Sequence, residues 1–357
     1  MPLFLTVTPH QLQFKFDART SRGAMRMHQV YYLLLYDSDS PGITGVGECA
    51  PLPGLSIDAR PDLESKLNQL AEQVGEQQLK ADEWQGFLMS DDLLEWPAIR
   101  FALETAWLDL QQVGRKTLFE NSFSQGTTGI PINGLVWMGE KDFMQQQISK
   151  KLNEGYTCLK LKIGSLDFAT ELDILHQIRE VAGPEDLTIR VDANGAFAPD
   201  EAFRKLERLA RYSLHSIEQP IRQGQPEQMQ QLCAYTPIPI ALDEELIGVQ
   251  DATKQAELLD FVKPQYIILK PTLVGGLQAS ADWIDMAAQH GIGWWMTSAL
   301  ESNIGLNAIS QFTANYAIDM PQGLGTGQLY HNNIASPLQI DKGWLWYGDS
   351  AWGELPR

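Results

Sequence analysis

The chain has 357 residues, of which 44% are hydrophobic and 20% are charged, and its formal net charge is −18. This composition is ordinary for a globular protein with a buried core and excludes a disordered chain. The acidic charge argues against a nucleic-acid partner, which needs clustered Lys and Arg.

The first 14 residues, MPLFLTVTPHQLQF, alternate in polarity and contain neither a signal peptide nor an unbroken apolar stretch. We therefore expect no membrane partner. Cys49, Cys158 and Cys233 are far apart and lack zinc-site spacing, which predicts buried thiols in a cytoplasmic protein. The sequence leaves the oligomeric state open.

Residues 1–95 are predicted to form a small α+β capping domain. Residues 3–16 and 29–36 have strand composition, and the basic loop ARTSRGAMRMH between them predicts a hairpin with a functional tip. A Gly- and Pro-rich run, ITGVGECAPLPGLS, follows before polar, helical segments that extend to about residue 94.

Residues 96–330 are predicted to form a barrel, because strand-like and helix-like segments alternate there. A helix that places Ile99, Leu103, Ala106 and Leu110 on one face opens this region. The predicted strands are 132–139, 158–164, 187–195, 215–220, 239–245, 266–271 and 291–298. A single barrel takes about 250 residues, which leaves room for the capping domain.

The eighth strand, predicted at 322–330, has the weakest signal because three glycines dilute it. The tail, residues 331–357, contains several Trp residues and is expected to pack back on the body, on the capping domain. The fold class is therefore α/β, a modified (β/α)₈ barrel with an N-terminal cap.

Three carboxylates close successive predicted strands: Asp192, Glu218 and Asp243. Each step, and the next one to Lys270, is about 26 residues, the length of one strand and one helix with their turns. The carboxyl ends of barrel strands open onto one mouth, so these side chains are expected to converge. An all-oxygen set indicates Mg²⁺, with Mn²⁺ as the other possibility, although each acid alone is better explained as a helix cap.

Lysines flank the acids. Lys160 and Lys162 lie on the same strand face, where like charge is expected to push one amine toward the neutral form of a general base. Lys270 on the sixth strand is either a second base or a fixed cation. The simpler alternative for Lys160 and Lys162 is a pair of solvated lysines on an exposed edge strand. For Lys270 it is a surface lysine that precedes a proline turn. With a metal, these amines suggest proton abstraction next to the carboxylate of a small molecule.

The order and spacing of five motifs resemble the enolase superfamily, in its muconate lactonising enzyme branch. The motifs are Lys160-Leu161-Lys162, Asp192-Ala193-Asn194, Glu218-Gln219-Pro220, Asp243-Glu244 and Lys270-Pro271. The resemblance implies capping loops that close the barrel mouth, Mg²⁺ held by the three acids, and Lys162 as the base tuned by Lys160. Residues beside the ligands, Asn194, Gln219 and Glu244, would support them.

Within that branch, three segments resemble the o-succinylbenzoate synthase family: Thr20-Ser21-Arg22-Gly23, Ser298 to Ser302, and Gly323 to Gly327. This implies dehydration of 2-succinyl-6-hydroxy-2,4-cyclohexadiene-1-carboxylate in menaquinone biosynthesis, with Lys162 removing the proton and Lys270 on the opposite face.

The distal succinyl group needs a receptor, and the residues expected around the substrate are Arg22, Ser298, Ser302, Gly325 and Thr326. Arg22 is equally well explained as a solvated loop residue. Ser302 precedes NIGLNAISQ and is expected to cap a helix whose amides accept a carboxylate, or simply to cap it.

Other enzymatic activities would use the same metal site and the same lysines. An N-acylamino acid racemase or a dipeptide epimerase would use the lysines on both faces, but the epimerases of this branch typically carry an Asp-x-Asp where this chain has Gly325-Thr326-Gly327. Muconate cycloisomerisation is a third activity of the branch. A non-catalytic metal scaffold would not need the lysines.

Overall fold

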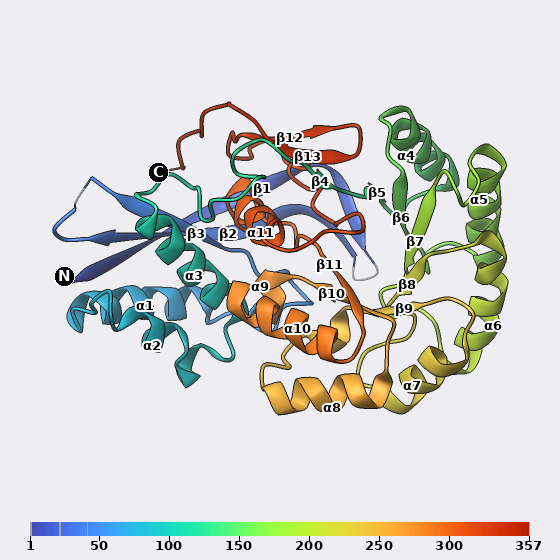
Figure 1. Cartoon of the computed structure of the whole chain (residues 1–357), viewed down its shortest axis with the longest axis horizontal. Helices are drawn as coiled ribbons and strands as arrows, with labels where there is room; N and C mark the ends of the chain where they lie inside the picture. The colour runs from blue at the N-terminus through green and yellow to red at the C-terminus, as the bar shows by residue number, and fades with distance from the viewer. Residues whose placement is uncertain (1, 21–22, 41, 357) are drawn as a thin grey trace.

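The computed structural model describes residues 2–20, 23–40 and 42–356. Figure 1 shows two parts, a cap at the N-terminal end and a curled parallel sheet whose helices lie on its outside. Arg22, at the tip of the predicted hairpin, lies outside the described residues.

The cap contains an antiparallel sheet in the order β1-β2-β3 and two helices that follow it. Its elements are β1 (Leu3–Thr20), β2 (Gly23–Asp37), β3 (Thr44–Cys49), α1 (Leu63–Glu76), α2 (Trp84–Leu88) and a 3₁₀ turn (Asp91–Leu93). Helix α1 buries Leu63, Leu67, Leu70 and Val74, one face at helical spacing, in the same core as the sheet. The predicted hairpin is confirmed, but its two strands extend through most of the predicted loop, to Thr20 and from Gly23.

Helix α3 (Pro97–Gln111) connects the two parts. It begins with Pro at its first turn, and Ile99, Leu103 and Ala106 share one buried face, as the sequence predicts. That face packs in the core of the cap. Strand β3 approaches so closely that a Cβ on Gly47 would lie 1.8 Å from the carbonyl oxygen of Ala102. Phe101, on another face of α3, packs in the barrel core.

The curled sheet has seven strands in the order β11-β10-β9-β8-β7-β6-β5, and all neighbours are parallel. The strands are β5 (Gly134–Val136), β6 (Cys158–Lys162), β7 (Thr188–Asp192), β8 (Ser216–Glu218), β9 (Ile240–Leu242), β10 (Tyr266–Leu269) and β11 (Gly293–Met296). Each lies inside one of the seven predicted runs, so these predictions are confirmed.

Helices follow the strands and cover the outer face of the sheet. They are α4 (Lys141–Asn153), α5 (Phe168–Val181), α6 (Pro199–Leu209), α7 (Pro226–Tyr235), α8 (Ala252–Val262), α9 (Pro271–Val274), α10 (Leu277–Gln289) and α11 (Asn303–Thr313). Two further 3₁₀ turns are Ala210–Tyr212 and Glu244–Leu246. None of the helices in the described ranges is both long and apolar enough to cross a membrane.

The eighth strand position holds only a short ladder instead of the predicted strand at 322–330. Gln322 bridges Ile132 and Gly323 bridges Thr297, both in parallel, so the segment joins the two edges of the sheet. A Cβ on Gly323 would lie 2.1 Å from the Thr297 hydroxyl, which explains a glycine at this seam.

The tail forms a second small antiparallel sheet in which β12 (Leu338–Asp341) pairs with β13 (Trp344–Tyr347), and β13 pairs with β4 (Ile130–Pro131). The segment just before it attaches to the cap, since Phe14 and Tyr330 form an antiparallel bridge. The tail therefore pairs with β4, which precedes the first strand of the curled sheet. Its first residues also contact the cap, because the backbone amide of His331 donates to the carbonyl oxygen of Gln13 and the side chain of Asn332 donates to that of Gln11, both at 2.8 Å.

Candidate active site

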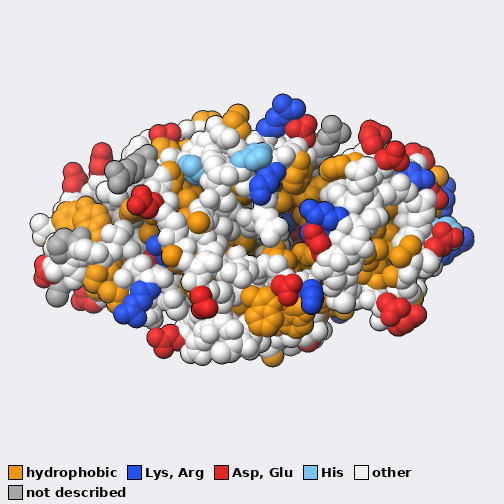
Figure 2. Space-filling model, turned by 90° about the horizontal axis from the view of Figure 1, so that it is seen from above, with side chains coloured by type: hydrophobic (Ala, Val, Ile, Leu, Met, Phe, Trp, Pro, Cys, Tyr) orange, Lys and Arg blue, Asp and Glu red, His pale blue; other side chains and the backbone are white. Residues whose placement is uncertain are grey.

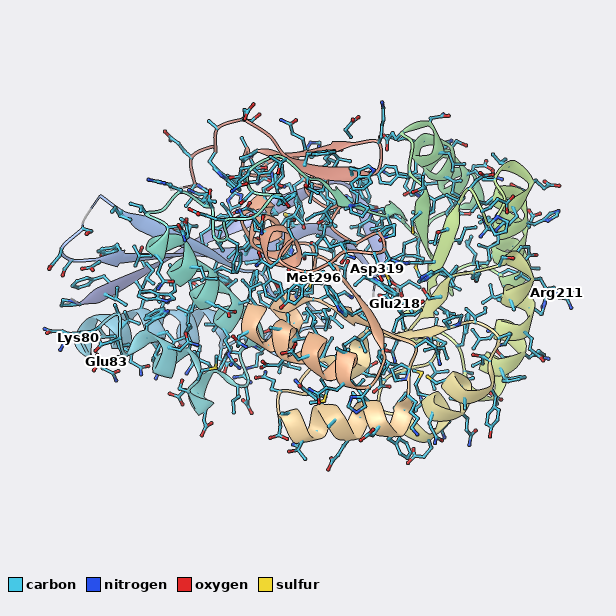
Figure 3. All side chains as sticks on the ribbon, viewed as in Figure 1. Lys80, Glu83, Arg211, Glu218, Met296 and Asp319 are labelled. Carbon is cyan, nitrogen blue, oxygen red and sulfur yellow. The ribbon has the colours of Figure 1, made fainter. Side chains whose placement is uncertain are left out.

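The three predicted carboxylates meet at the carboxyl ends of adjacent strands. Asp192 ends β7 and is the register partner of Glu218, which ends β8, while Asp243 directly follows β9. All three are at most 2% exposed. Figure 3 places Glu218 inside the molecule and Arg211, in the 3₁₀ turn that follows α6, on the outer surface. The predicted convergence is confirmed.

Two lysines from β6 reach this cluster from one side. Lys160 Nζ lies 3.0 Å from Asp192 Oδ2 and also pairs with Glu218. Lys162 Nζ lies 2.7 Å from the same Asp192 oxygen and donates a hydrogen bond of 2.8 Å to Asn194 Oδ1. Alternation along the strand thus brings both ammonium groups to one face, as the sequence predicts.

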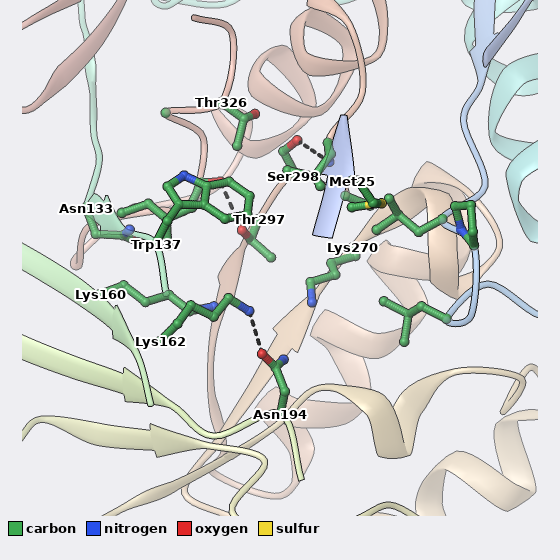
Figure 4. Close-up of a pocket in the computed structure, with 18 of the residues that line it drawn as sticks. Met25, Asn133, Trp137, Lys160, Lys162, Asn194, Lys270, Thr297, Ser298 and Thr326 are labelled. Atoms are coloured by element: carbon green, nitrogen blue, oxygen red, sulfur yellow. Dashed lines mark hydrogen bonds between the residues drawn. The ribbon is translucent and has the colours of Figure 1, made fainter. Parts of the chain in front are cut away.

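Lys270 approaches from β10, across the cavity from the other two lysines (Figure 4). Its ammonium group pairs with Asp243 and lies 3.9 Å from Glu218 Oε1. Three lysines and three carboxylates therefore form one continuous buried ion-pair network.

The carboxylates dominate the electrostatics of the network. Burial disfavours the Lys160 ammonium, but the nearby Asp192 and Glu218 outweigh burial and raise the pKa of Lys160. The sequence predicts that one of the two amines shifts toward the neutral form, and Lys160 is not that amine, because carboxylates lie within ion-pair distance of it. The pKa of Lys270 is raised too, since Asp243 and Glu218 outweigh its burial.

Burial and the neighbouring charges also shift the pKa values of the carboxylates. Burial and the neighbouring Asp192 raise the pKa of Glu218 to about 8, against the lowering effect of Lys160. Burial also acts on Asp192, but the three lysines outweigh it and lower its pKa. Burial is therefore the main cause of the raised pKa of Glu218, whereas the lysines lower the pKa of Asp192.

The residues fit a divalent cation by donor chemistry. All the donors are carboxylate oxygens, the set that hard cations prefer. Within the described part of the chain, both buried oxygens of Glu218 lack a hydrogen bond, although Lys160 and Lys270 pair with that carboxylate. Among the described side chains no three His, Cys, Asp or Glu groups stand close enough to hold a metal, and ammonium groups lie between the acids. Metal binding would require these ammonium groups to withdraw.

The residues that follow the acids hold them in place. The Asn194 backbone amide donates to Asp192 Oδ1 (3.0 Å), and its side chain donates to Glu244 Oε1 (3.2 Å). Gln219 Oε1 accepts from the backbone amide of Asp243 at 3.3 Å. Asn194 and Gln219 have φ values of 44° and 40°, a strained conformation that is common at functional sites.

A cavity of about 230 Å³, called here the active-site cavity, opens above the network between the barrel and the cap. Lysines form its base and its upper walls are mainly apolar. The lining residues include Met25 and Leu52 of the cap, Asn133, Leu135 and Trp137 of the first barrel strand and its flanks, Lys160, Lys162, Asn194 and Lys270, and Thr297, Ser298, Gly325 and Thr326. Ser298, Gly325 and Thr326 are thus where the sequence predicts them.

Ser302 is not brought to the cavity. It caps α11, and its backbone amide and hydroxyl donate to the two oxygens of Glu48 at 2.7 and 2.6 Å. The backbone amide of Gly305 donates to the same carboxylate at 2.8 Å. The prediction that these amides accept a substrate carboxylate is therefore corrected, because a buried carboxylate of the cap already binds them.

Sequence reasoning missed several residues of the site. Asn133, Trp137 and Thr297 line the cavity, and Glu48 anchors the helix beside it. Asn133 and Glu48 carry a usable signal, because each is a polar residue inside an otherwise apolar strand-like run.

Comparisons with known proteins agree with this geometry. The family model described as "Enolase C-terminal domain-like" matches residues 144–350. An o-succinylbenzoate synthase of Desulfotalea psychrophila is 48% identical over 94% of this chain and 96% of that protein. The crystal structure of MenC from that organism has a TM-score of 0.85, with 44% identity over 97% of this chain and 100% of that chain.

A less similar relative is named for a different activity. An N-succinylamino acid racemase of an Amycolatopsis species is 26% identical over 92% of this chain and 87% of that protein.

Proposed function

The chain belongs to the enolase superfamily and, within it, to the o-succinylbenzoate synthases, and on this premise we propose its reaction. It is a lyase that removes water from 2-succinyl-6-hydroxy-2,4-cyclohexadiene-1-carboxylate to give 2-succinylbenzoate, a step of menaquinone biosynthesis. The observation that carries the proposal is the convergence of three lysines on one cavity above three buried carboxylates.

Members of the superfamily use a divalent metal ion, and we assign Mg²⁺ to this chain, with Mn²⁺ as a substitute. Asp192, Glu218 and Asp243 would hold it, and when bound it would supply positive charge to the substrate carboxylate. A bound cation would also favour the ionised form of Glu218, whose pKa is raised by burial and by the neighbouring Asp192.

Lys162 is the proposed base. Its amine lines the cavity and is oriented by Asp192 and Asn194, which fix its position beneath the substrate. The amine takes the proton α to the ring carboxylate, and the electron pair of that C–H bond forms the new ring double bond as the C–O bond breaks. The same Lys162 then returns the proton to the departing hydroxide, which leaves as water.

Lys270 is the proposed fixed cation on the other face. It lies across the cavity from Lys162, so its ammonium group can stabilise the negative charge that develops on the substrate. Lys160, which bridges Asp192 and Glu218, is proposed to tune the charge of the site.

The succinyl end of the substrate is proposed to lie against the upper cavity. Ser298, Gly325 and Thr326 line that region, and the Thr326 hydroxyl is buried there with no hydrogen-bond partner among the described residues. Arg22 stays the proposed cationic contact from the capping hairpin. A cytoplasmic location is also proposed, because all three cysteines are free and buried.

The test is turnover of the purified protein with Mg²⁺, followed by the ultraviolet absorbance of the aromatic product. Lys162→Ala is expected to lower kcat by about 10²- to 10⁴-fold. Lys254→Ala, an exposed lysine on α8, is the matched control and should keep full activity. Unchanged turnover in Lys162→Ala would contradict the proposed base.

A second candidate is racemisation of N-succinylamino acids, which the Amycolatopsis relative and the lysines on opposite sides of the cavity favour. Dipeptide epimerisation has less support, because none of the described residues that line the cavity is acidic and a free ammonium group would lack a partner. Incubation in D₂O separates the activities: a racemase inverts its amino acid with deuterium uptake, whereas the synthase forms an aromatic product.

A further inference from the structure

A second cavity of about 390 Å³, called here the lysine cavity, lies behind one wall of the active site. It shares Asn133, Leu135, Trp137, Gly325 and Thr326 with the active-site cavity. Its outer lining combines aromatic side chains with three lysines: Phe16, Phe143, Tyr156, Lys15, Lys150 and Lys151. The mechanism above uses none of these six residues.

The shared wall contains unsatisfied polar groups. Thr326 Oγ1 and Asn133 Oδ1 are buried and have no hydrogen-bond partner among the described residues, and their side chains are only 6% and 4% exposed. Buried polar atoms are normally satisfied, so a group that enters from one of the two cavities is expected to bind them.

The charge of the lysine cavity is opposite to that of the molecule as a whole, which is −18. Lys151 is held in place, because its ammonium group lies 4.6 Å from the centre of the Tyr156 ring and 3.0 Å from Glu154. Lys150 lies 3.7 Å from the same carboxylate, and Lys15 has no ion pair in the described structure. Glu154 thus pairs with two of the three lysines. Figure 2 shows Lys and Arg side chains beside a hollow near the middle of the face seen from above.

Helix α4 links the lysine cavity to the wall of the active-site cavity. Gln147 of α4 accepts a hydrogen bond from the backbone amide of Trp137 (2.9 Å) and donates one to its carbonyl oxygen (3.1 Å). The Trp137 ring also packs edge-to-face on Phe16 of the cap, with the ring centres 5.4 Å apart. A ligand that contacts Phe143 and Gln147 would therefore touch the residues that position Trp137 in the active-site wall.

We propose that the lysine cavity binds a small aromatic carboxylate and couples its occupancy to the active site through Trp137. Ammonium groups bind the carboxylate, and the aromatic side chains pack on the ring. The product of the proposed reaction, 2-succinylbenzoate, has this chemistry. The choice of this ligand rests on the proposed function, whereas the existence of the site rests on the cavity and its charges.

The experiment titrates 2-succinylbenzoate into metal-free Lys162→Ala protein and measures binding by calorimetry. The titrant is the product and the readout is binding, so the result does not depend on turnover. The variant Lys151→Met removes the charge but keeps the alkyl stem against Tyr156, and Lys151→Arg keeps the charge. Lys254→Met on α8 is the control, because that lysine is exposed and lies outside both cavities.

We expect the Kd to rise about tenfold in Lys151→Met, the effect of losing one charged hydrogen-bond partner. Lys151→Arg and Lys254→Met should leave it unchanged. Equal affinity in Lys151→Met and its parent overturns the proposal, and so does the absence of binding once Lys162 is replaced and the metal is removed. Failure of the proposed function would instead appear as absent turnover in the wild-type protein, with the binding result unaffected.

Discussion

The Glu48 contact between the cap and helix α11 is expected to respond to pH. Glu48 is fully buried, and its carboxylate accepts hydrogen bonds from the backbone amides of Ser302 and Gly305 and from the Ser302 hydroxyl. Glu48→Gln keeps the shape of the side chain but replaces one acceptor oxygen with a donor. At least one of these donors then loses its acceptor, which costs about 1 to 3 kcal/mol of unfolding free energy.

The pH dependence follows from burial, which raises the pKa of Glu48 from 4.5 to about 7 in the folded protein. The folded state therefore binds the proton more tightly than the unfolded state, and wild-type stability falls as the pH rises from about 4.5 to about 7. At about 1.4 kcal/mol for each pKa unit, this loss is about 3 kcal/mol. Glutamine does not titrate. The destabilisation caused by Glu48→Gln should thus be larger at pH 5 than at pH 8, by about 2 to 3 kcal/mol.

The assay is urea unfolding of both proteins at pH 5 and pH 8 in EDTA, followed by far-ultraviolet circular dichroism. Other buried acids titrate in both proteins and cancel in the difference. Glu64→Gln, an exposed acid on α1, is the matched control and should show no such difference. The reasoning is refuted if Glu48→Gln destabilises equally at the two pH values, or more at pH 8.

Three further outcomes are expected. Gly47→Ala should lower the unfolding free energy by about 3 kcal/mol in thermal or urea unfolding, because its Cβ would lie 1.8 Å from a backbone oxygen of α3. Gly86→Ala, with open space around it, is the control and should not destabilise. Burial and a nearby guanidinium lower the pKa of His215 to about 4, so stability is lost as the pH falls from 6.5 toward 4. His215→Phe should reduce that loss by about 1 to 2 kcal/mol in acid titrations, since the ring is partly exposed. Removal of divalent cations with EDTA should abolish turnover and leave the circular dichroism spectrum unchanged, and added Mg²⁺ should restore activity; full activity in EDTA would contradict the metal assignment.

The sequence by itself determined the seven strands of the curled sheet, the convergence of Asp192, Glu218 and Asp243, and the shared face of Lys160 and Lys162. These features follow from local rules. Strand alternation has a period of two residues, and a repeating strand–helix unit brings successive strand ends to one edge of the sheet.

The tertiary structure decided the features that depend on distant contacts. Ser302 was predicted to cap a helix, but only folding brings it to Glu48, 254 residues earlier in the chain. The rise in the pKa of Lys160 depends on carboxylates from two neighbouring strands, which a pattern along one strand does not contain. The lysine cavity likewise combines β1, α4 and the segment after Gly325. Burial and charge at such places are set by pairings between remote segments, and these exist only in the folded protein.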